Sequence, residues 1–471
     1  MLRATLTSAF AVGMTSRLVV QALALAQIMM ASRFIGLAEF GSYALAWACV
    51  AIFSAFVFTG YYQAFLRTET PDEDRHTIFG SMLAFAMVAS VVLLVTGISI
   101  GDGTNLVSRI FLALALLPII ESVYAWNEAH LLRDGRMRTI SLLGTASEAV
   151  ATVVLILGLY EGFGPTALVA ARYAAVILNV TVSIFLVRQF PWPAFKGKVL
   201  REGRVTAIPL WVSTGAAMLA NYGIDLMLGV FLNPSNVGTY RGGARISQTA
   251  ADSVQQPLTV LTWSRFSRLV AEKRRRVIAF AWRINMSFGT AVAWPLMLCV
   301  ALLSKELVTV ILDDTWLPTA AIISILSLTR AIRILSSLLE PTLTSFDRQG
   351  LQLAIRLFGL VFTFLVILGF GRSSAEAAAM VQVYAAIFIT IITMELTRRV
   401  LKMSLGNLLQ TFVPGLLLSG LCGAFIMATE PMRLALEPMP GLFITLAGLS
   451  IVWGGAVAFC LWKGILRWPT L

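Results

Sequence analysis

The residues of this sequence that could do chemistry are arginines placed inside long apolar segments. A charged side chain at the depth of a membrane core is costly and usually serves a function. A guanidinium group binds anions, phosphates above all, through paired and charge-assisted hydrogen bonds. We expect each of them either to pair with a carboxylate on a neighbouring helix or to line a polar cavity. The candidates are Arg17, Arg172, Arg241, Arg245, Arg330 and Arg333.

Two of these arginines begin a polar stripe on one segment. Its members are separated by alternating steps of four and three residues, which places them on a single face of a helix. They are Arg241, Arg245, Gln248, Asp252, Gln255, Thr259 and Thr262. We expect such a stripe to face a cavity or another polar helix rather than lipid. For Arg241, at the outer end, snorkelling to the headgroups is an alternative.

The preceding segment has a second polar face, which includes Asn221 and Asp225. At 1.5 Å per residue, Asp225 lies about 12 Å from the outer end of its segment, and Arg245 lies at a similar depth. A short turn joins the two segments, so Asp225 and Arg245 are expected to be neighbours that can pair. Such a pair is either a structural clamp or part of a binding site, and the sequence leaves both open.

Two further segments carry arginines near the middle of the apolar run. Arg17 has Gln21 one helical turn away, and Arg330 and Arg333 share a face with Glu340. We expect Arg17, Arg330 and Arg333 to line a cavity, because charges at this depth are usually functional.

Acidic residues also lie inside the apolar segments, among them Glu121 and Glu148. Each could neutralise a nearby arginine or titrate in a proton-coupled step. The sequence favours pairing, but it does not identify the partners.

The elements that position these residues are long apolar helices. The chain has 471 residues, of which 58% are hydrophobic and 13% charged, whereas soluble domains average about 25% charged residues. Apolar runs of about twenty residues recur along the chain, which predicts an all-α polytopic membrane protein with about fourteen transmembrane helices. The segments are 7–32, 42–66, 77–100, 105–132, 139–160, 165–187, 205–232, 237–262, 277–302, 318–340, 351–370, 376–397, 407–428 and 441–463.

The distribution of cations orients these segments. With the N-terminus inside, the inner loops hold 23 Lys and Arg residues and the outer loops hold four. The positive-inside rule therefore places both termini in the cytoplasm. The basic loops, including "EKRRR", are an orientation signal and a contact for anionic membrane lipids. The net charge of +12 is accounted for in this way, and no nucleic-acid partner is expected.

The sequence lacks the usual signs of an enzyme. No loop exceeds about twenty residues, and we find no catalytic triad, phosphate-binding loop or dinucleotide fingerprint. The four cysteines lie inside apolar segments and the two histidines are far apart, so no metal site and no cofactor are expected. A transporter is predicted rather than an enzyme. An integral-membrane glycosyltransferase or polymerase is the least favoured alternative.

Two short motifs indicate an internal repeat. "RFIGLAEFGSYALA" (33–46) and "VFLNPSNVGTYRGG" (230–243) align at an offset of 197, which pairs Gly41 with Gly238 and Tyr43 with Tyr240. Repeats are common in transporters. We expect an N-terminal bundle over 1–190, a basic cytoplasmic linker over 191–204, a C-terminal bundle over 205–402 and two additional spans over 403–471.

The same motifs carry a resemblance to a known family. "SRFIGLAEFGSYALA" resembles the aRxLGxxxfGxYa pattern of bacterial polysaccharide flippases, and "GVFLNPSNVGTYRGGARI" is similar to their lxxxxvGxYxxAxRi element. "ILDDTW" (311–316) resembles their llfGxxW stretch but has Asp in place of the usual Gly. The family is a branch of the multidrug/oligosaccharidyl-lipid/polysaccharide exporter (MOP) superfamily.

The resemblance implies two pseudo-symmetric helical bundles in a V-shaped, MATE-like arrangement that works by alternating access. It implies a flippase that moves a polyprenyl-diphosphate-linked oligosaccharide from the cytoplasmic to the outer leaflet of the bacterial inner membrane. The product would be O-antigen, exopolysaccharide or capsule, made together with polysaccharide polymerase and export machinery. The six candidate arginines would then bind the diphosphate.

Other transporters stay open. A multidrug or organic-cation antiporter would be expected to have mainly acidic residues in its cavity, whereas arginines outnumber acids in the middle of these segments. A lipid II flippase is the third option. The sugar and the driving force are not specified by the sequence.

Overall fold

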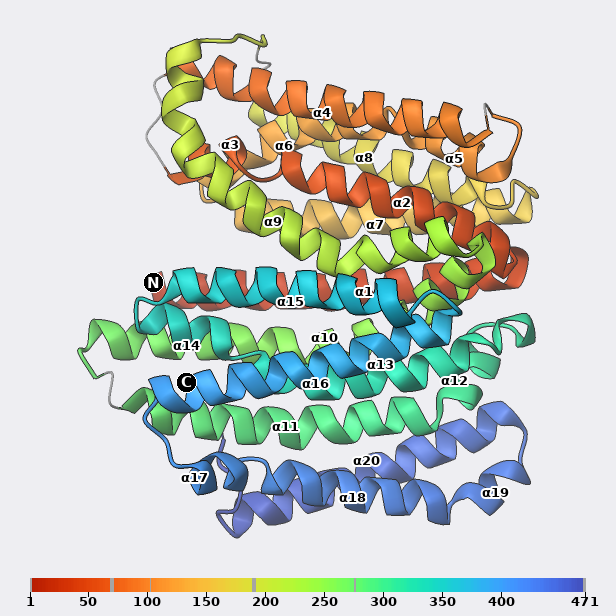
Figure 1. Ribbon diagram of the computed structural model, residues 1–471, viewed down its shortest axis with the longest axis vertical. Coiled ribbons are helices and arrows are strands. Elements are labelled where there is room, and N and C mark those ends of the chain that lie inside the picture. Colours follow the sequence, from red (N-terminus) through yellow and green to blue (C-terminus); the bar gives the residue numbers. More distant parts are fainter. Residues whose placement is uncertain (1, 68–71, 102, 189–191, 275–276, 469–471) are drawn as a thin grey trace. The chain divides into compact units, whose positions relative to one another are not determined.

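The computed structural model describes the chain except for residues 1, 68–71, 102, 189–191, 275–276 and 469–471 (Figure 1). Arg275 and Arg276, two of the expected cytoplasmic cations, lie outside the described residues, as do the expected domain limits at 1, 190, 191 and 471. The described residues form helices, turns and coil, and no strand. A helix satisfies its own backbone hydrogen bonds, as a segment in a membrane must.

The chain divides into two compact units, residues 1–238 and 239–471. The helices of the first unit are α1 (Leu2–Phe34), α2 (Leu37–Val57), α3 (Tyr61–Arg67), α4 (Asp72–Gly101), α5 (Leu106–Leu114), α6 (Leu117–Arg133), α7 (Met137–Tyr160), α8 (Thr166–Val187) and α9 (Gly197–Phe231). Helix α10 (Pro234–Ala271) begins in the first unit and continues in the second.

The second unit contains most of α10 and a further set of helices. They are α11 (Ile278–Leu302), α12 (Ser304–Ile311), η2 (Asp314–Trp316), α13 (Thr319–Arg333), η3 (Ile334–Ser336), α14 (Leu339–Ser345), α15 (Gln349–Phe370), α16 (Ala375–Val400), α17 (Leu405–Gln410), α18 (Val413–Ala428), α19 (Glu430–Leu434) and α20 (Pro438–Trp462). The η elements are short 3₁₀ helices.

Twelve helical stretches among the described residues are long and apolar enough to cross a membrane. Each of them lies on one of the segments expected from the sequence, so the all-α polytopic architecture is confirmed. The other two expected segments, 7–32 and 237–262, correspond to α1 and α10, which are helical but do not belong to the twelve. A total of fourteen spans stays a prediction.

The first unit is packed around pairs of neighbouring helices. Helix α7 lies against both α1 and α8, and α2 lies against α9 (Figure 1). An aromatic cluster joins α3, α4 and α6, in which the ring of Phe65 stacks on Trp126 at 5.3 Å and Phe79 meets the same indole edge-on at 5.7 Å. This cluster gives the unit a rigid apolar core beside its polar helices.

The two glycines of the repeated motif meet at the start of α10. A Cβ added to Gly41 would lie 1.7 Å from the carbonyl oxygen of Pro234, and one added to Gly238 would lie 2.0 Å from that of Leu37. Both distances are far below contact distance. Glycine is therefore required at these positions for the N-terminal turns of α2 and α10 to approach each other.

The second unit is built on α11, which packs against both α13 and α18, while α16 packs against α13 and α15. The last helices are held by an ion pair between Arg433 of α19 and Glu306 of α12, whose Nε and Oε1 atoms are 2.7 Å apart. Arg433 is 8% exposed. This pair fixes α19, and with it the loop between α18 and α20, to the rest of the unit.

Candidate substrate-binding site

Each unit contains one cluster of polar and charged side chains at the depth of its apolar helices. In the first unit the cluster is centred on Arg172 of α8. Its Nε donates a hydrogen bond to the hydroxyl of Tyr43 at 3.3 Å, and its Nη1 lies 3.5 Å from Oε2 of Glu148. Its Cζ lies 4.8 Å from the centre of the Trp47 ring, a cation–π contact. Helices α2, α7 and α8 therefore converge on this guanidinium group.

The cluster continues to the first helix through Glu148. Nε2 of Gln27 on α1 donates hydrogen bonds to Oε1 of Glu148 at 2.9 Å and to the hydroxyl of Thr152 at 3.0 Å. Gln27 is 6% exposed. Glu148 thus contacts one neutral donor, Gln27, and one cation, Arg172.

Gln27 was not among the residues expected at the site. Arg17 and Gln21, which are one helical turn apart, were expected at the site, but the structure places neither in this cluster. Arg17 is exposed and Gln21 is half-buried, and no ion pair of Arg17 occurs among the described residues. The signal for Gln27 was its polar side chain inside an otherwise apolar run.

Glu121 of α6 lies close to the same cluster. It is within electrostatic range of Arg172, and it is directed toward the hydroxyl of Ser54 on α2. No hydrogen bond of standard geometry joins the two side chains, and Oε2 of Glu121 and Oγ of Ser54 are both buried. The structure therefore gives Arg172 one ion-pair partner, Glu148, and one more distant carboxylate.

Asn221 and Asp225 lie on α9 of the first unit. Asn221 is exposed, whereas Asp225 is fully buried. The expected pair of Asp225 with Arg245 would join residues of the two units, and it stays a prediction.

The second unit brings together most of the arginines expected at the site. Arg330 of α13 is within electrostatic range of Asp252 and Arg241 of α10, and Asp252 is also in range of Arg245. Arg333 is in range of Arg330. Arg330 and Arg245 therefore lie near the carboxylate of Asp252, while Arg241 and Arg333 lie near Arg330.

Neutral polar groups of α10 complete this cluster. Gln248 lies one helical turn from Asp252 and close to its carboxylate. Gln248, Asp252 and Gln255 are all half-buried, as expected for one polar face of the helix. Further along, Thr262 is fully buried and accepts a hydrogen bond of 3.0 Å from Nδ2 of Asn285 on α11. The stripe thus passes from a charged part to a part packed inside the unit.

The expected continuation of the arginine face from Arg330 and Arg333 to Glu340 is wrong. Helix α13 ends at Arg333 and a 3₁₀ turn follows, which breaks the helical register before α14 begins. Glu340 pairs instead with Arg356 of α15, at 3.5 Å between Oε2 and Nη2. Pro341 was the signal for this break, because its ring clashes with the carbonyl group four residues earlier in a continuous helix.

The two repeated tyrosines make corresponding contacts. Tyr43, near the start of α2, hydrogen-bonds Arg172 near the start of α8. Tyr240, near the start of α10, hydrogen-bonds Gln382 near the start of α16. In each unit, therefore, the tyrosine of the Gly-x-Tyr motif binds a polar side chain at the same place on another helix.

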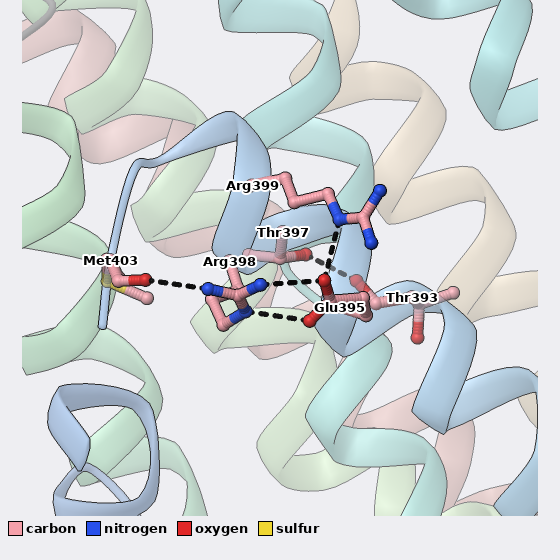
Figure 2. A network of polar contacts seen from close by, with 6 residues as sticks. All are labelled: Thr393, Glu395, Thr397, Arg398, Arg399 and Met403. Atoms are coloured by element: carbon pink, nitrogen blue, oxygen red, sulfur yellow. Dashed lines mark hydrogen bonds and ion pairs between the residues drawn. The ribbon is translucent and has the colours of Figure 1, made fainter. Parts of the chain in front are cut away.

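A third cluster lies at the end of α16 and was missed as a cluster, because its arginines were counted only as cytoplasmic cations. Figure 2 shows Glu395 between Arg398 and Arg399. Glu395 accepts two hydrogen bonds from Arg398, at 2.7 and 2.8 Å, and one of 2.6 Å from Arg399. Arg398 also donates to the carbonyl oxygen of Met403 at 3.4 Å. The cluster secures the turn between α16 and α17, and its spacing of three and four residues was its sequence signal.

The described residues contain no group of three or more His, Cys, Asp or Glu side chains that could hold a metal ion.

Comparison with known proteins connects this architecture to a family. Residues 29–321 match the family described as "Polysaccharide biosynthesis protein". No protein of curated function matches the chain by sequence.

Solved structures share the fold at low identity. The inward closed conformation of the lipid II flippase MurJ has a TM-score of 0.76 at 10% identity, covering 96% of this chain and 99% of that one. An inward-facing multidrug resistance MATE transporter of the MOP superfamily has a TM-score of 0.60 at 10% identity, with 82% and 94% covered. A MOP superfamily transporter from Pyrococcus furiosus has a TM-score of 0.52 at 14% identity, with 84% and 96% covered. The chain therefore shares the fold of these transporter structures.

Proposed function

Because the chain belongs to the polysaccharide biosynthesis protein family and has the fold of MOP superfamily transporters, we propose that it flips a polyprenyl-diphosphate-linked oligosaccharide across a membrane. The movement would run from the cytoplasmic to the outer leaflet of the bacterial inner membrane. The oligosaccharide would serve surface polysaccharide synthesis, with a polymerase and export machinery acting on the delivered product.

The observation that carries this proposal is the arginine cluster of the second unit. Arg245 and Arg330 lie near the carboxylate of Asp252 on helices α10 and α13, and Arg241 and Arg333 lie near Arg330. Guanidinium groups that lie close together at membrane depth are stabilised by an anion placed among them. A diphosphate, with its several oxygens, offers each guanidinium group the paired hydrogen bonds that it forms best.

The proposed cargo also needs a route across the membrane for its charged head group. We expect two pseudo-symmetric bundles, with fourteen spans in total, to provide this route by opening alternately to the two sides. The N- and C-termini are expected in the cytoplasm. The corresponding tyrosine contacts, Tyr43 with Arg172 and Tyr240 with Gln382, support the pseudo-symmetry. Arg17, Arg172, Asn221 and Asp225 would contribute to the same route from the first unit.

The proposed mechanism is electrostatic and conformational. The arginines of the second unit bind the diphosphate. Its oxygen atoms replace water as hydrogen-bond acceptors of the guanidinium groups. Movement of the bundles then opens the route to the outer side. In the first unit, Glu148 holds Arg172 and Gln27 together, so we expect Glu148 to position Arg172 rather than to carry a proton.

Two other cargoes remain to be distinguished. A multidrug or organic-cation antiporter is disfavoured, because an excess of arginines repels a cationic substrate. A lipid II flippase would use the same diphosphate chemistry, and the fold shared with MurJ is compatible with it. An integral-membrane glycosyltransferase or polymerase is the least favoured.

A deletion strain complemented with variants tests the proposal. We expect Arg245→Ala and Arg330→Ala to reduce surface polysaccharide at least about tenfold, because each removes a charge-assisted contact with the diphosphate. Arg17→Ala tests the contribution of the first helix in the same assay. Arg330→Lys should restore only part of the activity, since Lys keeps the charge and loses the paired geometry.

The control is Arg348→Ala, which removes an exposed cation outside the cluster and should restore the polymer fully. Full restoration by expressed Arg17→Ala, Arg245→Ala and Arg330→Ala proteins would refute the cationic site. A defect in cell-wall synthesis with normal surface polysaccharide would indicate lipid II as the cargo.

A further inference from the structure

A separate cationic cleft lies in the second unit, at the ends of α10, α11 and α20 that the distribution of cations assigns to the cytoplasmic side. It has two adjoining parts with volumes of about 320 and 570 Å³. Phe280, Ile284 and Arg467 line both parts. Volumes in this range are typical of small-molecule sites. None of the arginines proposed to bind the transported diphosphate lines this cleft, which therefore needs an explanation of its own.

The charge in this cleft is of one sign. Arg283 of α11 lines the first part, Arg265 of α10 lines the second, and Arg467 lines both. Among the residues that the structure describes, no acidic side chain lines either part. Nη1 of Arg265 is buried without a hydrogen-bond partner among the residues that the structure describes. A buried donor of this kind is costly unless an acceptor from outside the chain reaches it.

Aromatic and apolar groups frame the charges. Cζ of Arg467 lies 5.7 Å from the centre of the Phe280 ring, and the Trp468 ring lies 5.4 Å from that of Phe288. These contacts hold the segment after α20 against α11. Trp462 and Trp468 are 76% and 62% exposed, and exposed tryptophans beside cations are typical of the interface between membrane and water.

We propose that this cleft binds the phosphate headgroup of an anionic phospholipid in the cytoplasmic leaflet. The phosphate lies between Arg283 and Arg467, within reach of Arg265, and the acyl chains follow the apolar side chains of Ile284, Leu461 and Leu466. A lipid fits better than a soluble phosphate ester, because most of the side chains around the second part are apolar or aromatic. The proposal does not depend on the identity of the transported cargo.

Native mass spectrometry of the delipidated, full-length protein tests this assignment with phosphatidylglycerol as the probe. The double variant Arg283→Gln/Arg467→Gln should bind phosphatidylglycerol at least about tenfold more weakly than the wild type, because it loses two charge-assisted contacts. Arg201→Gln/Arg348→Gln is the matched control, because it removes two exposed cations outside the cleft and should leave binding unchanged. Arg467→Gln alone changes only an exposed side chain after α20, and it serves if the double variant does not fold.

Two further probes identify the source of the phosphate. Phosphatidylcholine, which is zwitterionic, should bind more weakly than phosphatidylglycerol, and millimolar glycerol 3-phosphate should not displace phosphatidylglycerol. Equal phosphatidylglycerol binding by folded wild type and variants would overturn the proposal. Binding of glycerol 3-phosphate as tight as that of the lipid, and lost in the same variants, would overturn the assignment to a lipid.

Discussion

At the scale of the residue, the ion pair of Arg172 and Glu148 connects several helices of the first unit. Arg172 is held by Tyr43, Trp47 and Glu148, and Glu148 is held in turn by Gln27. Four helices thus depend on two charged side chains. Removing one charge leaves the other without its partner, and this is more damaging than removing both.

A double-mutant cycle tests this interaction. We expect Glu148→Gln to destabilise the purified protein by about 3 kcal/mol or less, since the side chain of Arg172 is still 26% exposed. Adding Arg172→Gln should recover part of the loss, with a coupling of about 0.5–3 kcal/mol. Thermal unfolding in detergent measures both values. Strictly additive effects of the two changes would show that the two residues do not depend on each other.

The sequence indicated Arg172 and Glu148 as polar residues inside apolar segments, but not that they meet. Their contact depends on how α7 and α8 pack, and Gln27 joins them only because α1 lies against α7. Spacing along one helix predicts which residues share a face. It cannot predict which residue of a distant helix that face will meet.

At the scale of the element, the close approach of α2 and α10 depends on glycine. Gly41→Ala should destabilise the protein or prevent its folding, because the added Cβ would overlap the carbonyl group of Pro234. Gly144→Ala is the matched control. Gly144 is also inside a helix, α7, but a Cβ there meets nothing within 4 Å, so the same change should stabilise by up to about 1 kcal/mol.

Thermal unfolding and the yield of folded protein compare these two variants directly. Equal behaviour of Gly41→Ala and Gly144→Ala would contradict the account of this helix contact. The motif was visible in the sequence as a repeated Gly-x-Tyr, but the reason for its glycine became clear only from the distance between the two backbones.

The observed helices agree with the expected segments where the length of an apolar run alone determines the helix. Twelve expected segments correspond to helices that can cross a membrane, because an apolar run of about twenty residues has few other stable arrangements there. Within the segment 318–340, the spacing of the polar residues predicted one helical face for Arg330, Arg333 and Glu340, and this prediction was wrong. The 3₁₀ turn Ile334–Ser336 rotates the chain between Arg333 and Glu340, and the periodic spacing of polar residues does not reveal it.

At the scale of the whole molecule, the two units carry different electrostatic environments. Arg172 of the first unit forms an ion pair with Glu148, whereas Arg330 of the second unit lies near a second arginine, Arg241, as well as near Asp252. Arg333 lies near Arg330 in turn. We therefore expect an anionic cargo to bind mainly to the second unit. The sequence located these arginines but did not show which other charged groups lie near each of them.

Flipping by the purified protein in proteoliposomes is the measurement that tests the central claim most directly. A fluorescent polyprenyl-diphosphate oligosaccharide placed in both leaflets reports its movement through its exposure to a membrane-impermeant quencher. The wild type should render nearly all of the label accessible to the quencher, and Arg330→Ala/Arg333→Ala should slow this movement at least about tenfold. Unchanged flipping by that variant, or transport of organic cations in place of the lipid-linked sugar, would contradict the account.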